Sequence, residues 1–363
     1  MNPQIHSESV RDLGPRVERR AVIDVGSNSV KLLVADVGWR LRPVLKLRLR
    51  TGLGQGAFRT HCLQPEAIAR TVDVVQTFAA EAVGLGCTSI RVLATSAARE
   101  ATNSHELAQA VQRATGLSVE VISGEQEADY VFEGVSSDPL IGAQPVLIIK
   151  VGGGSTEWVV AERGVVHFRK STRIGTVRLL EFNPLGDPPG HAALARLRAT
   201  VREFVRAEVS PSLEPVLRAF CGRAVRLVGL GGSLQALARV GGGPAGSCQR
   251  NTLRREQLVK QVELVWGLTV LERRRLSGLD AERAEVILPG GVICEAVLEQ
   301  FGFEEVLISS RGPREGALLL GLGNPDQWRW SGLRLGSEAW GMGIQPVFEA
   351  GLLKPANPAP LPS

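Results

Sequence analysis

A strand-loop-strand pattern occurs twice in this chain, at residues 21–36 and again at residues 146–161. In each copy an apolar run ends at a charged residue, passes through a short loop of glycine, serine or asparagine, and continues as a second apolar run. Such loops let backbone N–H groups approach an anion closely, because glycine has no Cβ and the short polar side chains donate hydrogen bonds. A hairpin turn would explain either copy alone. Two copies in register favour a duplicated nucleotide- or phosphate-binding fold.

The two copies differ at one charged position: Asp24 of the first is replaced, 126 positions later, by Lys150 in the second. A third glycine turn, at residues 231–233, follows the strand predicted at 224–230 and precedes the helix predicted at 234–240. Glycines before a helix N-terminus offer N–H groups to an anion, although close packing of a helix on a strand often requires them too. The residues predicted to contact phosphate through these three loops are Ser27, Asn28, Lys150, Gly152, Gly153, Gly154, Ser155, Gly231 and Gly232.

Composition and charge exclude several classes of protein. The chain has 363 residues, 44% hydrophobic and 22% charged, which is ordinary for two globular domains. The net charge of +5 suits a polyanionic ligand, and no helix-turn-helix, zinc-finger or aromatic-basic pattern indicates a specific nucleic acid. No apolar run approaches the ~20 residues that cross a bilayer, and no signal-peptide pattern begins the chain. We therefore expect a cytoplasmic protein with no membrane partner. The five cysteines are widely spaced and predict neither disulfides nor a zinc site.

Apolar and basic residues alternate at 41–50 as in a strand, and a second strand is predicted at 89–94, followed by a polar turn at 95–99. Helices are predicted at about 104–115 and from about 191 to 209. Strands that alternate with helices at these lengths predict an α/β fold. Turn-forming residues at 136–145 predict a linker between two domains. We predict a flexible N-terminus at 1–19, domain I at 20–138, domain II at 139–323, and a disordered tail, rich in proline and glycine, at 324–363. A homodimer is the default expectation for oligomeric state.

Five segments, in order, resemble the exopolyphosphatase and guanosine pentaphosphate phosphohydrolase family, which lies in the superfamily of actin, the sugar kinases and the heat-shock chaperone ATPases. These segments are residues 23–29, 94–103, 121–128, 151–157 and 229–233. Because no single motif has to carry it, the resemblance is specific, and it covers about residues 20 to 322. It implies two ribonuclease-H-like domains with a cleft between them.

The resemblance also implies a chemistry: release of terminal phosphate from inorganic polyphosphate or guanosine pentaphosphate. It assigns Glu127 as the base that activates water, Arg99 as a phosphate contact, and Asp24 and Glu157 as carboxylates of a Mg²⁺ site. Hydrolysis of a phosphoanhydride needs an oriented water and stabilised charge, with little covalent work by the protein. Without its motif, Glu127 would be interpreted as a solvated acid on a helix.

The chain departs from the family pattern at two positions. Gln126 replaces one acid of a usual acidic pair, and Glu127 retains the other. Lys150 stands where the family places an aspartate that helps to hold the cation. Its ammonium within ~4 Å of Mg²⁺ would repel the ion strongly, which predicts a weakened metal site, although Asp24 and Glu157 with phosphate oxygens are enough ligands to retain the ion.

Three interpretations of Lys150 remain open at this point. It forms an ion pair with Asp24 across the cleft, it contacts phosphate as a tethered cation, or it is an introduced substitution. We favour preserved phosphate binding with reduced or altered catalysis.

The leading function is therefore a phosphoanhydride hydrolase of reduced activity, and the alternative is a non-hydrolysing regulator that binds polyphosphate or a nucleotide. A kinase or chaperone of the superfamily is disfavoured, since the segments around Arg99 and Glu127 resemble the phosphatase branch. The sequence does not rank the two phosphate substrates.

Overall fold

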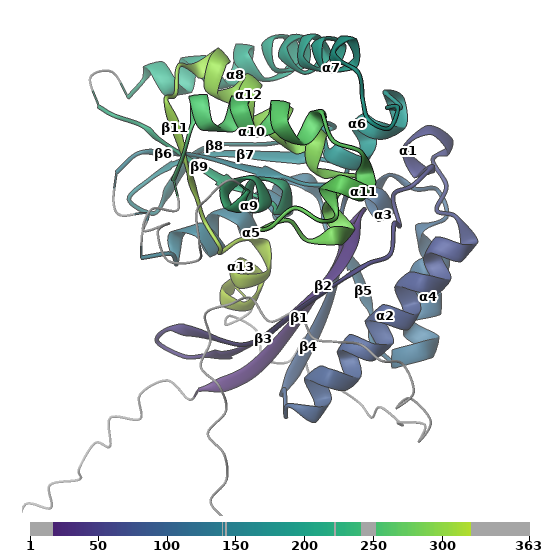
Figure 1. The fold of residues 1–363 in the computed structure, drawn as a ribbon. Helices are drawn as coiled ribbons and strands as arrows, with labels where there is room; N and C mark the ends of the chain where they lie inside the picture. The colour runs from purple at the N-terminus through teal and green to yellow at the C-terminus, as the bar shows by residue number, and fades with distance from the viewer. Residues whose placement is uncertain (1–16, 140, 142–143, 221–222, 241–251, 321–363) are drawn as a thin grey trace, which may run out of the picture.

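Two mixed β-sheets form the framework of the protein (Figure 1). The computed structural model describes residues 17–139, 141, 144–220, 223–240 and 252–320. In the first sheet the order is β3 (Leu41–Arg50), β2 (Ser29–Val37), β1 (Glu18–Val25), β4 (Ser89–Ala94) and β5 (Val119–Val121). Strands β1 to β3 are antiparallel neighbours, whereas β4 and β5 run parallel to β1.

The second sheet repeats this arrangement and adds one strand. Its order is β10 (Thr252–Arg254), β11 (Glu305–Ile308), β9 (Arg226–Leu230), β6 (Val146–Val151), β7 (Thr156–Glu162) and β8 (Val165–Thr172). Strands β6 to β8 are antiparallel neighbours, and β9 and β11 continue the sheet in parallel. The repeated hairpins of the sequence are thus β1–β2 and β6–β7, which hold the same position in each sheet.

Helices cover both faces of each sheet. On the first sheet, α2 (Pro65–Gly84) and α4 (Ser104–Thr115) pack against the face of Ala21 and Ile23, because the apolar residues of α2 recur at helical spacing. On the second sheet, a larger group of helices packs against the face of Leu147 and Ile149. That group comprises α7 (His191–Phe204), α9 (Gly232–Arg239), α10 (Arg255–Trp266) and α12 (Ile287–Phe301).

The shorter helices connect these layers. They are α1 (Ala57–Thr60), α3 (Ser96–Glu100), α6 (Thr176–Phe182), α8 (Ser210–Arg218) and α11 (Val270–Arg273), with a π turn at Val205–Val209 and a 3₁₀ turn at Ala281–Arg283. Within the described residues, no helix is long and apolar enough to cross a membrane.

Two helices lie between the sheets and join them. Helix α5 (Gly124–Ser136) packs on the face of Ile148 in the second sheet, and α13 (Pro313–Leu320) packs on the face of Leu33 in the first. The two helices contact each other at glycines: a methyl group at Gly316 would lie 1.9 Å from the carbonyl oxygen of Tyr130. This close approach requires glycine at that position.

We expect Gly316→Ala to lower the free energy of unfolding by about 1–3 kcal/mol, because the added Cβ meets backbone that must shift. Urea denaturation of the purified variant measures this loss. Gly84→Ala is the matched control, since among the described residues no heavy atom beyond its chain neighbours and the backbone of its own helix lies within 4 Å of the added methyl group. It should leave stability unchanged or raise it by about 0.5–1 kcal/mol. Equal losses in both variants would contradict the tight α5–α13 contact.

Several elements were predicted with accurate limits, and others were not. The strand at Ser89–Ala94 and the helix at Ser104–Thr115 are confirmed. The polar turn predicted at residues 95–99 is wrong, because α3 begins at Ser96. The helices predicted from about 191 to 209 are confirmed as α7, which ends at Phe204, and the π turn Val205–Val209 that follows it.

The division into domains at residues 138 and 139 stays a prediction. Helix α5 belongs to predicted domain I but packs on the second sheet, and α13 belongs to predicted domain II but packs on the first. Strand β1 begins at Glu18 and takes in the last two residues of the predicted flexible N-terminus. Residues 1–16, part of the linker, and the predicted tail at 324–363 lie outside the described residues. The described cysteines Cys62, Cys87 and Cys294 are free thiols.

Candidate functional site at the two phosphate loops

The two loops have the same turn and face each other directly. The amide of Gly26 donates to the carbonyl of Ser29 at 3.2 Å, and the amide of Gly152 donates to the carbonyl of Ser155 at 2.9 Å. A methyl group at Gly153 would lie 3.0 Å from Ser27 Cβ. The duplicated loops therefore lie directly against each other.

One cavity lies between these loops and the turn from β9 to α9. Its lining brings together Asp24 and all nine residues predicted to contact phosphate, from Ser27 to Gly232. Gly231 requires its glycine, because its φ is +119° and a methyl group would lie 2.3 Å from the carbonyl oxygen of Val151. The other predicted site residues are close by: Arg99 and Ser155 line a neighbouring cavity, and Glu127 contacts Lys150.

Sequence reasoning missed three basic residues that line the same cavity, Lys31, Arg48 and Arg283. The alternation of apolar and basic residues in the strand at 41–50 was a signal for Arg48. Arg283 lies over Gly232, where an added methyl group would fall 1.0 Å from its Nη1. The cavity adjoins a second one, whose lining adds Lys46, Arg239, Arg311 and Arg314 together with the acids Asp280, Glu282 and Glu315.

Glu127 is placed by the start of helix α5. The Ser123 hydroxyl accepts from the amide of Gln126 at 3.1 Å, and the Gln126 side chain accepts from the amide of Ser123 at 2.8 Å, which closes a capping box. Gln126, the departure from an acidic pair, thus stabilises the helix start. Glu127 follows in the same turn and is fully buried.

Both carboxylate oxygens of Glu127 contact cations. Arg99 Nη1 donates to Glu127 Oε2 at 3.1 Å and to the carbonyl oxygen of Ile122 at 2.9 Å. The Lys150 ammonium makes a short ion pair with Glu127 Oε1. Arg99 therefore orients the buried glutamate, in addition to lining a cavity of its own.

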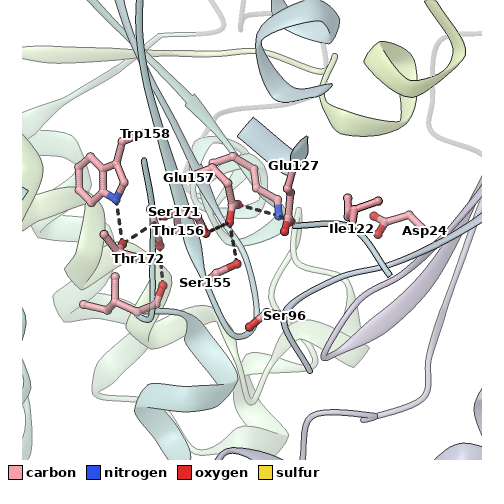
Figure 2. Close-up of polar contacts among 12 residues, drawn as sticks. Asp24, Ser96, Ile122, Glu127, Ser155, Thr156, Glu157, Trp158, Ser171 and Thr172 are labelled. Carbon is pink, nitrogen blue, oxygen red and sulfur yellow. Dashed lines mark hydrogen bonds and ion pairs between the residues drawn. The ribbon is translucent and has the colours of Figure 1, made fainter. Parts of the chain in front are cut away.

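Lys150 and Glu157 are direct neighbours across strands β6 and β7. Lys150 Nζ lies 2.9 Å from Glu157 Oε2. The hydroxyls of Ser155 and Ser171 donate to Glu157 Oε1 at 2.7 and 3.0 Å (Figure 2). Within the described residues, Glu157 Oε2 accepts no regular hydrogen bond, so the ammonium is its partner by charge. Both ends of this carboxylate are thus held in place.

The first hairpin carries the same cross-strand ion pair with its charges reversed. Asp24 on β1 faces Lys31 on β2, and Lys31 Nζ lies 3.4 Å from Asp24 Oδ2. An ion pair between Lys150 and Asp24 was one alternative from the sequence. It is wrong, because Lys150 pairs with Glu127 and Glu157 while Asp24 pairs with Lys31.

A model of the Ppx/GppA phosphatase family matches residues 32–324. The chain belongs to the Ppx/GppA phosphatase family. It is 33% identical over 306 residues to a guanosine-5'-triphosphate,3'-diphosphate pyrophosphatase of Aeromonas salmonicida, with 84% of this chain and 59% of that protein covered. The chain thus spans about three-fifths of this relative's length.

Two further relatives match nearly along their whole length. Exopolyphosphatase 2 of Mycobacterium tuberculosis is 31% identical over 316 residues, covering 83% of this chain and 98% of that protein. The crystal structure of the Ppx/GppA family member of Aquifex aeolicus superposes with a TM-score of 0.66 at 29% identity, covering 84% and 98% of the two chains. The predicted fold class is confirmed: an α/β protein with two actin-like domains.

The buried charges of this Ppx/GppA site shift one another's pKa values. Burial, followed by the Glu157 carboxylate, raises the pKa of Glu127, although Lys150 and Arg99 oppose the shift. Burial would lower the pKa of Lys150, but the carboxylates of Glu127, Glu157 and Asp24 outweigh it and raise the pKa. Burial and a second carboxylate thus raise the pKa of Glu127, whereas the carboxylates around the ammonium raise the pKa of Lys150. Lys150 is therefore charged at neutral pH.

The pair in the first hairpin behaves differently. Burial lowers the pKa of Lys31 to about 8, with Asp24 opposing. Burial would raise the pKa of Asp24, but Lys31 and Lys150 outweigh it and the pKa is lowered. Asp24 is thus a carboxylate at neutral pH.

The Mg²⁺ site implied by the Ppx/GppA family can be tested against these contacts. Mg²⁺ needs oxygen ligands at about 2.0–2.1 Å in octahedral geometry. Here the oxygens of Asp24, Glu127 and Glu157 contact ammonium groups, and no cluster of three or more His, Cys, Asp or Glu in the described residues is placed to hold a metal. The residues present do not fit a divalent ion bound directly by Asp24 and Glu157.

Proposed function

We propose that this chain releases terminal phosphate from inorganic polyphosphate or guanosine pentaphosphate, with Glu127 as the base, at a rate reduced by Lys150. The observation that carries the proposal is the meeting of two phosphate loops around a cavity that also presents Lys31, Arg48 and Arg283. Relatives named for both substrate classes support it. Neither class is favoured by the contacts described above.

The residues supply the parts that phosphoanhydride hydrolysis needs. Loop amides and the basic side chains hold phosphate oxygens, since both are donors to anions. A water attacks the terminal phosphorus, Glu127 takes the proton, and the shortened phosphate chain leaves with the electrons of the broken P–O bond. The raised pKa of Glu127 brings it closer to the pH at which a general base works best.

One observation favours the alternative, a regulator that binds the same ligands without hydrolysis. The Lys150 ammonium contacts Glu127 Oε1, and Arg99 contacts Glu127 Oε2. Both cations lower the pKa of Glu127 against the burial that raises it, so they make this carboxylate a weaker proton acceptor than it would be without them. We propose the hydrolase first, because each oxygen retains a further lone pair for a water proton.

The experiment that separates these functions measures phosphate release and binding together. The purified chain is assayed with polyphosphate of uniform length and with guanosine pentaphosphate, and binding of each is titrated. Release of phosphate supports the hydrolase. Binding without release supports the regulator, and absence of both would overturn the proposed function.

We expect Arg99→Ala to weaken polyphosphate binding by about 1.5–3 kcal/mol, the contribution of a charge-assisted contact. The affinity should also depend less steeply on salt, because one fewer counterion is released on binding. Titration at several ionic strengths measures both effects. Unchanged affinity at low salt would leave Arg99 with only its structural contact to Glu127.

Arg173→Ala is the matched control for Arg99. Both residues line the same cavity, but the Arg173 side chain is 77% exposed and that of Arg99 is 21% exposed. The control removes the same charge from a solvated position and should weaken binding much less.

The cytoplasmic location and the homodimer stay predictions from the sequence.

A further inference from the structure

A cation of the chain itself, Lys150, lines the cavity between the two loops. The Lys150 ammonium contacts Glu127 on helix α5 and lies 2.9 Å from Glu157 on strand β7. Two carboxylates that converge from different elements need a positive charge between them, since like charges in a buried site repel. Lys150 supplies that charge from strand β6.

Comparison of the two hairpins shows why a lysine suits this position. In the first, Asp24 is neutralised across the strands by Lys31. In the second, Glu157 occupies the place of Lys31, so an acid at position 150 would face Glu157 as well as Glu127. Three carboxylates would then share one buried site and would require an external cation. Lys150 restores an opposite charge across the second hairpin without one.

The ammonium also lies within reach of the phosphate loop. A methyl group at Gly152 would lie 3.2 Å from Lys150 Nζ, and the Lys150 side chain lines the cavity between the loops. An ammonium has three N–H donors. Among the described residues, Glu127 accepts one of these hydrogen bonds and Glu157 pairs with the ammonium by charge, so a donor is left for a phosphate oxygen held by the loop.

We propose that the Lys150 ammonium replaces a divalent cation between the two phosphate loops, so that this chain binds the phosphate groups of its ligand without a metal ion. The inference rests on the proposed function for the identity of the ligand. The role of Lys150 as the cation does not depend on that function, because its contacts with Glu127 and Glu157 are independent of any ligand.

The first test measures metal binding with no phosphate present. Mn²⁺, observed by electron paramagnetic resonance, is titrated into the parent and into Lys150→Asp, with folding checked by circular dichroism. We expect the variant to bind one Mn²⁺ more than the parent, because the aspartate completes a site of three carboxylates. If the parent binds as many Mn²⁺ ions as tightly as the variant does, the inference is overturned.

The second test measures ligand binding in EDTA and in Mn²⁺, with polyphosphate of uniform length as the probe. We expect the parent to bind in EDTA and the Lys150→Asp variant to bind at least about tenfold more weakly there, recovering with Mn²⁺. If the parent binds polyphosphate only when Mn²⁺ is present, the inference is overturned but the proposed function is not. Failure of the parent to bind polyphosphate or guanosine pentaphosphate under either condition would overturn the proposed function, while the Mn²⁺ titration still decides what occupies the cation position.

Discussion

Replacing Glu127 by glutamine is expected to lower the rate of phosphate release by about 10²–10⁴-fold, the usual contribution of a general base. The amide keeps the shape of the side chain but cannot accept a proton from the attacking water. Polyphosphate binding should remain nearly intact, because the loop residues that line the cavity are unchanged. Initial rates at saturating polyphosphate, with a parallel binding titration, measure the two effects separately.

Glu125→Gln is the matched control for this experiment. Glu125 lies in the same first turn of α5, but its side chain is 72% exposed, whereas that of Glu127 is 1% exposed. The control makes the same chemical change outside the site and should leave the rate unaltered. A Glu127→Gln rate within about twofold of the parent would remove Glu127 from the mechanism, since general-base loss is far larger.

The meeting of the two loops was predictable from the sequence because each loop combines local signals. Gly26 and Gly152 follow apolar runs, short polar residues come next, and a second strand continues each pattern. Duplication in register then implies two similar halves that face each other, and the contact of Gly153 with Ser27 confirms it. Local composition was sufficient for this part of the site.

The burial of Glu127 could not be predicted from its own surroundings. An acid in the first turn of a helix is usually solvated and favoured by the helix dipole. Glu127 is buried because Arg99 and Lys150 contact it from 28 and 23 positions away. Its motif indicated a role, but the pairing depends on how α5 packs between the sheets.

The partners of Lys150 illustrate a signal that was present but not used. In a hairpin, residues equally distant from the turn face each other across the strands, so a loop at 152–155 places residue 150 opposite residue 157. This register predicts the Lys150–Glu157 pair, whereas the interpretation through Asp24 relied on the cleft alone. Arg48 and Arg283 had weaker signals, because they reach the cavity from a remote strand and a 3₁₀ turn.

Lys150→Asp is expected to make phosphate release depend on magnesium and to raise it about tenfold or more above the parent at saturating magnesium. The shorter aspartate would lie across the strands from Glu157, and the place of the ammonium between Glu127 and Glu157 would be left for the cation. Three carboxylates supply hard oxygen ligands, and a cation at the transferring phosphoryl group contributes several kcal/mol. In EDTA the same variant should release phosphate more slowly than the parent, because the acids then repel the substrate.

The measurement is the release rate against magnesium concentration for the parent, Lys150→Asp and Lys150→Met, with polyphosphate in excess. Lys150→Met is the matched control, since it removes the charge and retains most of the side-chain length without adding a ligand. It should lack the magnesium-dependent rise, which separates gain of a carboxylate from loss of an ammonium. A parent already as active and as magnesium-dependent as Lys150→Asp would mean that Lys150 leaves room for the cation beside Glu157. The regulator would then lose its main support, because the contact of Lys150 with Glu127 would not limit catalysis.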